Sequence, residues 1–318
     1  MKNQKGTCIR LLQSATALLL ALVIAVLCSG MALAADTYGF PFADSRYFTY
    51  GDYRLHYRIV PAAGERLGRI LMLHGFLCST YAWRHMASEM AAAGYECVLV
   101  DLPDFGYSTR ETPEMQIVPR EELVVSLMQS IAPMREWIVA GHSMGGGVAV
   151  NIAVDQPVRA LLLYCASAQI TFPAWAKGLM TSKGMKRFAD LLYGYGTRFD
   201  PVVRLVILAA TNDCAFTASY DLSGVTDPVQ YDHFGAGMCE MMYTVQPTRM
   251  DETDKITCPV LLCQADHDVI LNRAQKEQMR NAFPDARTYT VVGGGHQCIE
   301  NRAAELSAVT CAFLAGQK

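Results

Sequence analysis

The sequence predicts an α/β fold: a mostly parallel, doubly wound sheet that carries a mostly helical insertion. Three observations predict it. Short apolar segments alternate with helical patterns, which is typical of a parallel sheet covered on both faces. One interruption, residues 169–255, is too long for a loop and lacks the strand pattern. Finally, Ser143 stands in a glycine-rich turn between an apolar strand and a helix.

The amino-terminal part of the body predicts the first half of this sheet. Tyr47 to Tyr50 and Tyr53 to Val60 alternate around Gly51-Asp52, as in a β-hairpin. Next come a strand from Arg69 to Leu73, a helix from Tyr81 to Ala93, a strand from Cys97 to Val100 and a helix opened by Pro119. Glu121 and Glu122 in the first turn of that helix suit its dipole.

The alternation continues after this helix and resumes beyond the interruption. The expected elements are a strand from Trp137 to Ala140, a helix to Asp155, and strands from Ala160 to Tyr164, Pro259 to Cys263 and Thr288 to Val292. Asn272 and Gln275 form a capping-box start for a helix to Ala282, and a closing helix runs to Ala315. We therefore expect a core of residues 35–168 and 256–318. Residues 169–255, rich in aromatic and methionine side chains, form a cap over the carboxyl ends of the strands.

The first 34 residues have the features of a secretory leader. Lys2, Lys5 and Arg10 precede an almost wholly apolar run from Leu11 to Leu27, and Ala32-Leu33-Ala34 supplies small residues for cleavage after Ala34. The run is also nearly long enough to span a bilayer, so an uncleaved anchor is the alternative. Both interpretations place the body outside the cytoplasm, secreted or anchored.

Composition excludes some classes of function. The formal net charge is −3 and no basic run follows the leader, so nucleic acid is not an expected partner. Nine cysteines lie beyond the leader, an odd number that cannot all pair internally. Cys214 and Cys239 could bridge, and no His/Cys cluster has the spacing of a zinc site, so no metal is predicted.

Ser143 is the candidate nucleophile. The stretch Gly141-His142-Ser143-Met144-Gly145 is a G-x-S-x-G nucleophile elbow in the expected strand-turn-helix context. The turn holds a serine hydroxyl above the sheet, and it closes only if the flanking positions have almost no side chain.

A serine needs a base and an acid, which in such sheets follow it along the chain in the order acid, histidine. His296 follows Gly293-Gly294-Gly295 after the last strand, and is the predicted base. Asp266 has the expected spacing after the strand that ends at Cys263, with Asp268 as the alternative. Two backbone N–H groups, of Met144 and of Phe76 in His74-Gly75-Phe76, are the predicted oxyanion donors.

Several motifs together resemble the α/β-hydrolase superfamily, in its branch with an inserted cap. They are L-H-G-F with Trp83 and Arg84, D-L-P-D-F-G-Y-S (Asp101 to Ser108), G-H-S-M-G-G (Gly141 to Gly146), A-D-H-D-V (Ala265 to Val269) and G-G-G-H (Gly293 to His296). Relatives usually have glycine where Asp104 stands. The segment around Phe76 and Trp83 is also similar to epoxide hydrolases and dehalogenases, but those families use an aspartate at the elbow, and Ser143 argues against their chemistry.

The sequence is thus interpreted as an exported serine hydrolase that cleaves a small apolar ester and needs no cofactor. The resemblance leaves C–C bond hydrolysis, amidase or peptidase action and cofactor-free perhydrolysis open. A binding module that has lost turnover is the alternative outside the enzymes. The intact set of triad residues disfavours such a module, because a pure binder does not need all three side chains.

Overall fold

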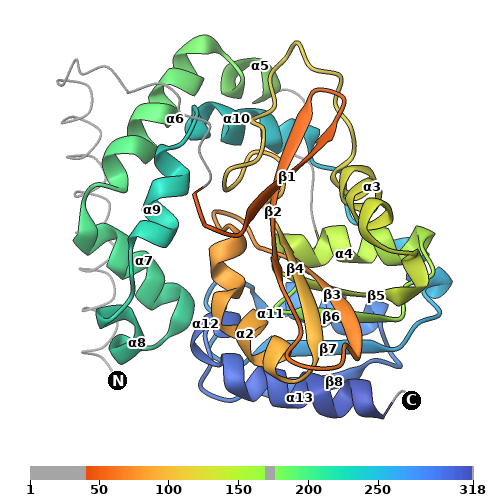
Figure 1. Ribbon diagram of the computed structural model, residues 1–318. Coiled ribbons are helices and arrows are strands. Elements are labelled where there is room, and N and C mark those ends of the chain that lie inside the picture. The colour runs from red at the N-terminus through yellow and green to blue at the C-terminus, as the bar shows by residue number, and fades with distance from the viewer. Residues whose placement is uncertain (1–40, 169–175, 317–318) are drawn as a thin grey trace.

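A computed structural model describes residues 41–168 and 176–316 (Figure 1). The leader predicted from residues 1–34, with its cleavage site, lies outside these residues. No helix within them is long and apolar enough to cross a membrane. Their nine cysteines are all free thiols, so Cys214 and Cys239 are not bridged.

One eight-stranded sheet forms the centre of the molecule, in the order β1-β2-β4-β3-β5-β6-β7-β8. The strands are β1 (Ser45–Tyr50), β2 (Tyr53–Val60), β3 (Gly68–Leu73), β4 (Tyr95–Val100), β5 (Trp137–His142), β6 (Ala160–Tyr164), β7 (Val260–Ala265) and β8 (Arg287–Val291). Strands β1 and β2 form an antiparallel hairpin, and β2 also pairs antiparallel with β4. The remaining pairs of neighbouring strands are parallel. The predicted mostly parallel α/β sheet is confirmed.

Helices cover both faces of the sheet (Figure 1). The core helices are η1 (Thr80–Trp83), α2 (Arg84–Ala92), α3 (Arg120–Ile131), η2 (Met134–Glu136), α4 (Met144–Asp155), α11 (Arg273–Ala282), α12 (Cys298–Asn301) and α13 (Ala303–Ala315). In β5, Trp137 and Val139 join the apolar cluster beneath α3 and α4, and Ile138 and Ala140 join the cluster beneath α2 and α13. Because both faces are buried, this strand reads as a continuous apolar run.

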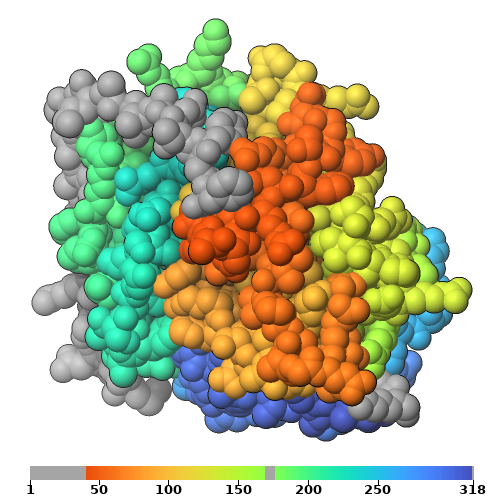
Figure 2. Space-filling model, in the orientation of Figure 1, coloured from red at the N-terminus to blue at the C-terminus, as the bar shows by residue number. Residues whose placement is uncertain are grey.

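The segment between β6 and β7 is helical from residue 177 onward. It contains α5 (Lys177–Met180), α6 (Lys183–Gly196), α7 (Asp200–Thr211), α8 (Cys214–Ala218), α9 (Ser223–Gln230), α10 (Phe234–Thr244) and η4 (Met250–Lys255). Residues 177–255 are called the cap below. In the view of Figure 2 the cap packs along one flank of the core. The side chain of Phe234 packs edge-on to Phe105, and Arg110 donates to the carbonyl oxygens of Pro228 and Tyr231.

Asp104, the departure from the family pattern, has a structural explanation. Its φ of 71° lies in the left-handed region, where glycine is favoured and aspartate is tolerated. The carboxylate accepts hydrogen bonds from the Glu111 N–H (2.7 Å) and from Arg120 Nη2 (2.6 Å). These buried hydrogen bonds hold the loop in the conformation that glycine usually permits.

Candidate active site

Ser143 lies at the sharp turn from β5 into α4, as the elbow motif predicts. Its φ of 49° and ψ of −120° are strained for a residue with a side chain. The turn is tight, since a Cβ at Gly145 would lie 2.4 Å from the carbonyl oxygen of Leu73. Only glycine permits α4 to start this close to the end of β3.

The loop after β3 passes directly against Ser143. A Cβ at Gly75 would lie 3.0 Å from Ser143 Cβ and 2.8 Å from His142 Nδ1. The two predicted oxyanion residues therefore flank the serine, Phe76 on this loop and Met144 at the start of α4. Both of these residues also line the same cavity.

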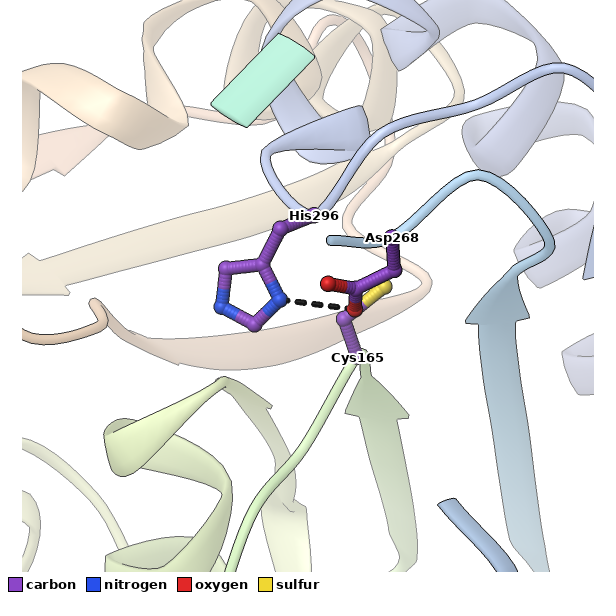
Figure 3. Close-up of side chains that lie close together, drawn as sticks. All are labelled: Cys165, Asp268 and His296. Atoms are coloured by element: carbon purple, nitrogen blue, oxygen red, sulfur yellow. Dashed lines mark hydrogen bonds and ion pairs between the residues drawn. The ribbon is translucent and has the colours of Figure 1, made fainter. Parts of the chain in front are cut away.

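His296 pairs with Asp268 and not with Asp266, so the predicted identity of the acid is wrong. His296 Nδ1 lies 2.8 Å from Asp268 Oδ2, and both side chains are buried (Figure 3). Because the carboxylate accepts the proton on Nδ1, the lone pair of the imidazole lies on Nε2. This is the tautomer that a general base requires.

Asp266 has a different role in the same loop. It is exposed, and its Oδ1 accepts the N–H of Gly293 at 2.7 Å. The N–H of His267 donates to the carbonyl oxygen of Gly294. Asp266 and His267 therefore fasten the glycine loop that carries His296, while Asp268 contacts the imidazole.

The backbone around Asp268 fixes its carboxylate as an anion. Oδ1 accepts the N–H groups of Ile270 and Leu271, each at 2.9 Å. Burial alone would raise the pKa of this carboxyl, but the hydrogen bond and charge of His296, together with these amides, outweigh burial and lower the pKa. The pair is therefore suited to stabilise a positive charge on the imidazole.

The ring of His142 packs against the ring of His296 and forms a hydrogen bond with its backbone. Its Nε2 donates to the carbonyl oxygen of His296 at 3.0 Å, and the two rings lie 5.0 Å apart. Burial, reinforced by the neighbouring His296, lowers the pKa of His142 to about 3. His142 is thus a neutral packing partner, as its place inside the elbow suggests.

A thiol completes the cluster that Figure 3 draws. Potential ligand atoms of Cys165, Asp268 and His296 lie within 4.8 Å of one another. The Cys165 thiol contacts Cys298 Sγ at 3.7 Å, and this hydrogen bond together with burial raises the pKa of Cys165 well above its usual range. A protonated thiol is a poor metal ligand, so the donor set fits a proton-transfer pair better than a bound cation.

An apolar cavity of about 500 Å³ lies between the elbow and the cap. The core contributes Phe76, Met144 and Ser167, and the cap contributes the rest of the wall: Met180, Met185, Phe188, Ala189, Leu192, Tyr193, Met238, Cys239, Met241, Met242 and Val245. Methionine side chains adapt to irregular apolar shapes. The cavity is therefore suited to an apolar group of adjustable shape.

The fold is a mostly parallel α/β sheet, and a serine nucleophile elbow lies at the carboxyl ends of its strands. Residues 70–309 match the model of the alpha/beta hydrolase family, and the chain belongs to that family.

Relatives and solved structures agree with this assignment. The magnesium-chelatase 30 kDa subunit of Rhodobacter capsulatus is 26% identical over 80% of this chain and 89% of its own length. A pimeloyl-[acyl-carrier protein] methyl ester esterase of Hamiltonella defensa is 32% identical over 33% of this chain and 39% of its own. The enol-lactonase of Burkholderia xenovorans superposes with a TM-score of 0.67 at 17% identity, over 85% of this chain and 100% of its own, and thus shares the fold.

Proposed function

We propose that the protein is an exported serine hydrolase that cleaves a carboxylic ester through an acyl-enzyme intermediate. The observation that carries the proposal is the buried Asp268–His296 pair, which contacts His142, the residue next to Ser143 on the strained elbow. Two similar proteins named above act on esters by their names, the methyl ester esterase and the enol-lactonase.

In this mechanism Ser143 Oγ attacks the ester carbonyl carbon as His296 Nε2 takes the hydroxyl proton. The N–H groups of Phe76 and Met144 donate to the oxyanion that forms. His296 then passes the proton to the leaving alcohol as the acyl-enzyme forms. A water molecule, deprotonated by His296, releases the acid and regenerates Ser143. Asp268 stabilises the imidazolium in both halves.

The apolar cavity supports an ester with an apolar acyl or alkyl group as substrate. Its wall is mostly apolar, with Ser167 and Tyr193 as its hydroxyl-bearing side chains, so most polar substituents would lose their hydration without compensation.

A fluorophosphonate probe tests the nucleophile, because it labels only an activated serine. We expect one label on the parent chain, at Ser143, and none on Ser143→Ala. Hydrolysis of p-nitrophenyl esters in the same preparations then separates a hydrolase from a binding module. Labelling at another residue, or turnover that survives Ser143→Ala, would contradict the proposed mechanism.

Export is proposed from the leader in the sequence. A mature chain that begins at Ala35 is expected on amino-terminal sequencing of secreted material, and an intact Met1 in the membrane fraction would favour the anchor.

A further inference from the structure

The outer side of the cap exposes apolar side chains in a regular pattern. On α7, Pro201, Leu205 and Ala209 recur at every fourth position and are all exposed. Leu205 and Val206 are 61% and 59% exposed, and Phe199, just before the helix, is 48% exposed. Single apolar residues are common on surfaces, but these five lie within eleven consecutive residues.

The segment that contains the helices α5 to α7 carries a net positive charge, although the chain as a whole is acidic. Residues 177–211 contain six basic and two acidic side chains, although the whole chain has a net charge of −3. Lys186 pairs with Glu240, and Arg204 donates to the carbonyl oxygens of Thr217 and Ala218. The other four basic side chains, those of Lys177, Lys183, Arg187 and Arg198, are exposed.

The helices α5, α6 and α7 follow one another down one flank of the molecule (Figure 1). Exposed cations and exposed apolar side chains on successive helices of one flank are the combination that binds the interface of a bilayer with anionic lipids. Phe199, Leu205 and Val206 are suited to the boundary between headgroups and acyl chains, and Lys183 and Arg187 to the phosphates.

We propose that this flank of the cap docks on a lipid bilayer that carries anionic headgroups. Charge complementarity favours this occupant over a second copy of the chain, whose like-charged flank would repel it. The apolar run from Leu11 to Leu27, if it remains attached, would hold the body close to such a surface.

Docking there would bring the cavity close to the lipid. Helix α6 contributes Lys183 and Arg187 to the outer flank and Met185, Phe188 and Leu192 to the cavity wall. A single helix thus separates the basic surface from the cavity. An apolar substrate dissolved in the bilayer would have a short path to the site.

Tryptophan quenching by lipids with brominated acyl chains tests the docking on the full chain, without any need for catalysis. Leu205→Trp reports on the flank. Leu67→Trp is the matched control, because Leu67 is also exposed (42%) but lies outside the cap, just before the amino end of β3, a central strand of the sheet. The unsubstituted chain supplies the baseline from its own three tryptophans, Trp83, Trp137 and Trp175, of which Trp83 and Trp137 are fully buried.

With vesicles of phosphatidylglycerol and phosphatidylcholine, we expect emission at position 205 to fall at least twofold more than at position 67. Phosphatidylcholine alone should give much less quenching, and Lys183→Gln with Arg187→Gln in the Leu205→Trp chain should remove the difference between the two vesicles. Equal quenching at both positions, or none at 205, would overturn the proposal. A blue-shifted emission at position 205 without lipid would also overturn it. If that shift did not depend on protein concentration, another part of the same chain would cover the flank. If the shift grew with concentration, a second copy of the chain would cover it.

An activity measurement adds a second criterion. Leu205→Glu should keep the parent rate on a water-soluble short ester and lose at least tenfold on the same ester carried in anionic vesicles. Loss on both substrates would indicate damage to the site or fold, and no loss on either would count against docking. If the protein hydrolysed no ester at all, the proposed function would fail while the quenching result still decided the docking.

Discussion

Ser143, His296 and Asp268 lie at the carboxyl edge of the sheet, and a second set of the same residue types lies between β1, β2 and the end of β4. In this second set Ser45 Oγ is 2.8 Å from His56 Nε2, and His56 Nδ1 is 2.7 Å from Asp101 Oδ2. The order of contacts is that of a catalytic triad. The two sets differ in the backbone conformation of the serine and in the cavity beside it.

The hydroxyl of Ser45 is already engaged in both directions. It accepts the N–H of Phe42 at 3.0 Å and donates to His56, and it lies in a regular strand. His56 and Asp101 are fully buried, and Asp101 also accepts the N–H groups of Thr80 and Tyr107. Ser143, by contrast, lies on a strained turn beside two residues that line a cavity. Ser45 and Ser143 are about equally buried, with 7% and 8% of each residue exposed. What separates the two serines is that Phe42 and His56 engage the Ser45 hydroxyl within a strand, whereas Ser143 lies on a strained turn whose neighbours line a cavity.

The largest expected effect comes from removing each serine in turn. Ser143→Ala should lower kcat on any hydrolysed ester by on the order of 10⁴-fold or more, with little change in melting temperature. Ser45→Ala should do the opposite: kcat stays within a few-fold, but a buried N–H and imidazole lose their partner, which costs about 1–3 kcal/mol of unfolding free energy. Steady-state kinetics and urea unfolding of both variants measure this. If Ser45→Ala abolished turnover while folding was intact, the distinction between the two sets would be lost.

The second prediction concerns the two neighbouring aspartates. Asp268→Asn should lower kcat by roughly 10⁴-fold, because the amide cannot hold His296 in the correct tautomer as an anion does. Asp266→Asn, the matched control two residues away, keeps an oxygen that can accept the Gly293 N–H and should stay within about tenfold of the parent. The reverse ranking of the two variants would restore Asp266 as the acid.

The misplaced acid shows how far sequence reasoning reaches. The strand expected to end at Cys263 runs on to Ala265, because Gln264 and Ala265 pair with Thr290 and Val291 of β8. Gln264 is buried as well, where it donates to the carbonyl oxygen of Lys276. The acid lies three residues past the strand end in both cases, so an error of two residues in the strand end became an error of two residues in the acid. A polar glutamine gave no sign, in the sequence, that the strand continues.

Motifs with strict backbone demands were predicted correctly. The order of the sheet strands along the chain, the elbow at Ser143 and the capping box of Asn272 with Gln275 all appear as expected. The cap was less predictable, because its apolar side chains lie in three different environments: the core, the cavity wall and the surface. Phe234 packs on Phe105 and Tyr193, Met185 lines the cavity, and Leu205 faces outward. Trp175, another aromatic residue of the predicted cap, lies outside the described residues.

The third prediction uses the neutral His142 beneath the site. Its pKa is lowered from 6.5 to about 3, so below pH 6.5 the unfolded chain binds a proton that the folded chain does not. Stability contributed by this group is present above pH 6.5 and is lost as the pH falls toward 3, at up to about 1.4 kcal/mol per pH unit. His142→Gln should therefore flatten the dependence of unfolding free energy on pH between 6 and 4. Equal slopes in the parent and His142→Gln would refute the assignment.

The smallest expected effect is at the cavity wall, where the site meets the rest of the substrate. The elbow and the Asp268–His296 pair act on any ester carbonyl and do not select the attached groups, so selection falls to the side chains of the wall. Met185→Ala removes one of these side chains, and the space it leaves should favour a longer acyl group. One methylene in an apolar pocket is worth about 1–3 kcal/mol, so the change in kcat/KM per step of chain length should be graded, roughly 10- to 200-fold at most. Met250→Ala is the matched control, since Met250 lies in η4 and packs on the core away from the cavity. The measurement is kcat/KM over a series of p-nitrophenyl esters of increasing acyl length. If Met185→Ala and the parent preferred the same chain length, the wall would be a packing surface only, and selectivity would have to come from the residues nearest Ser143.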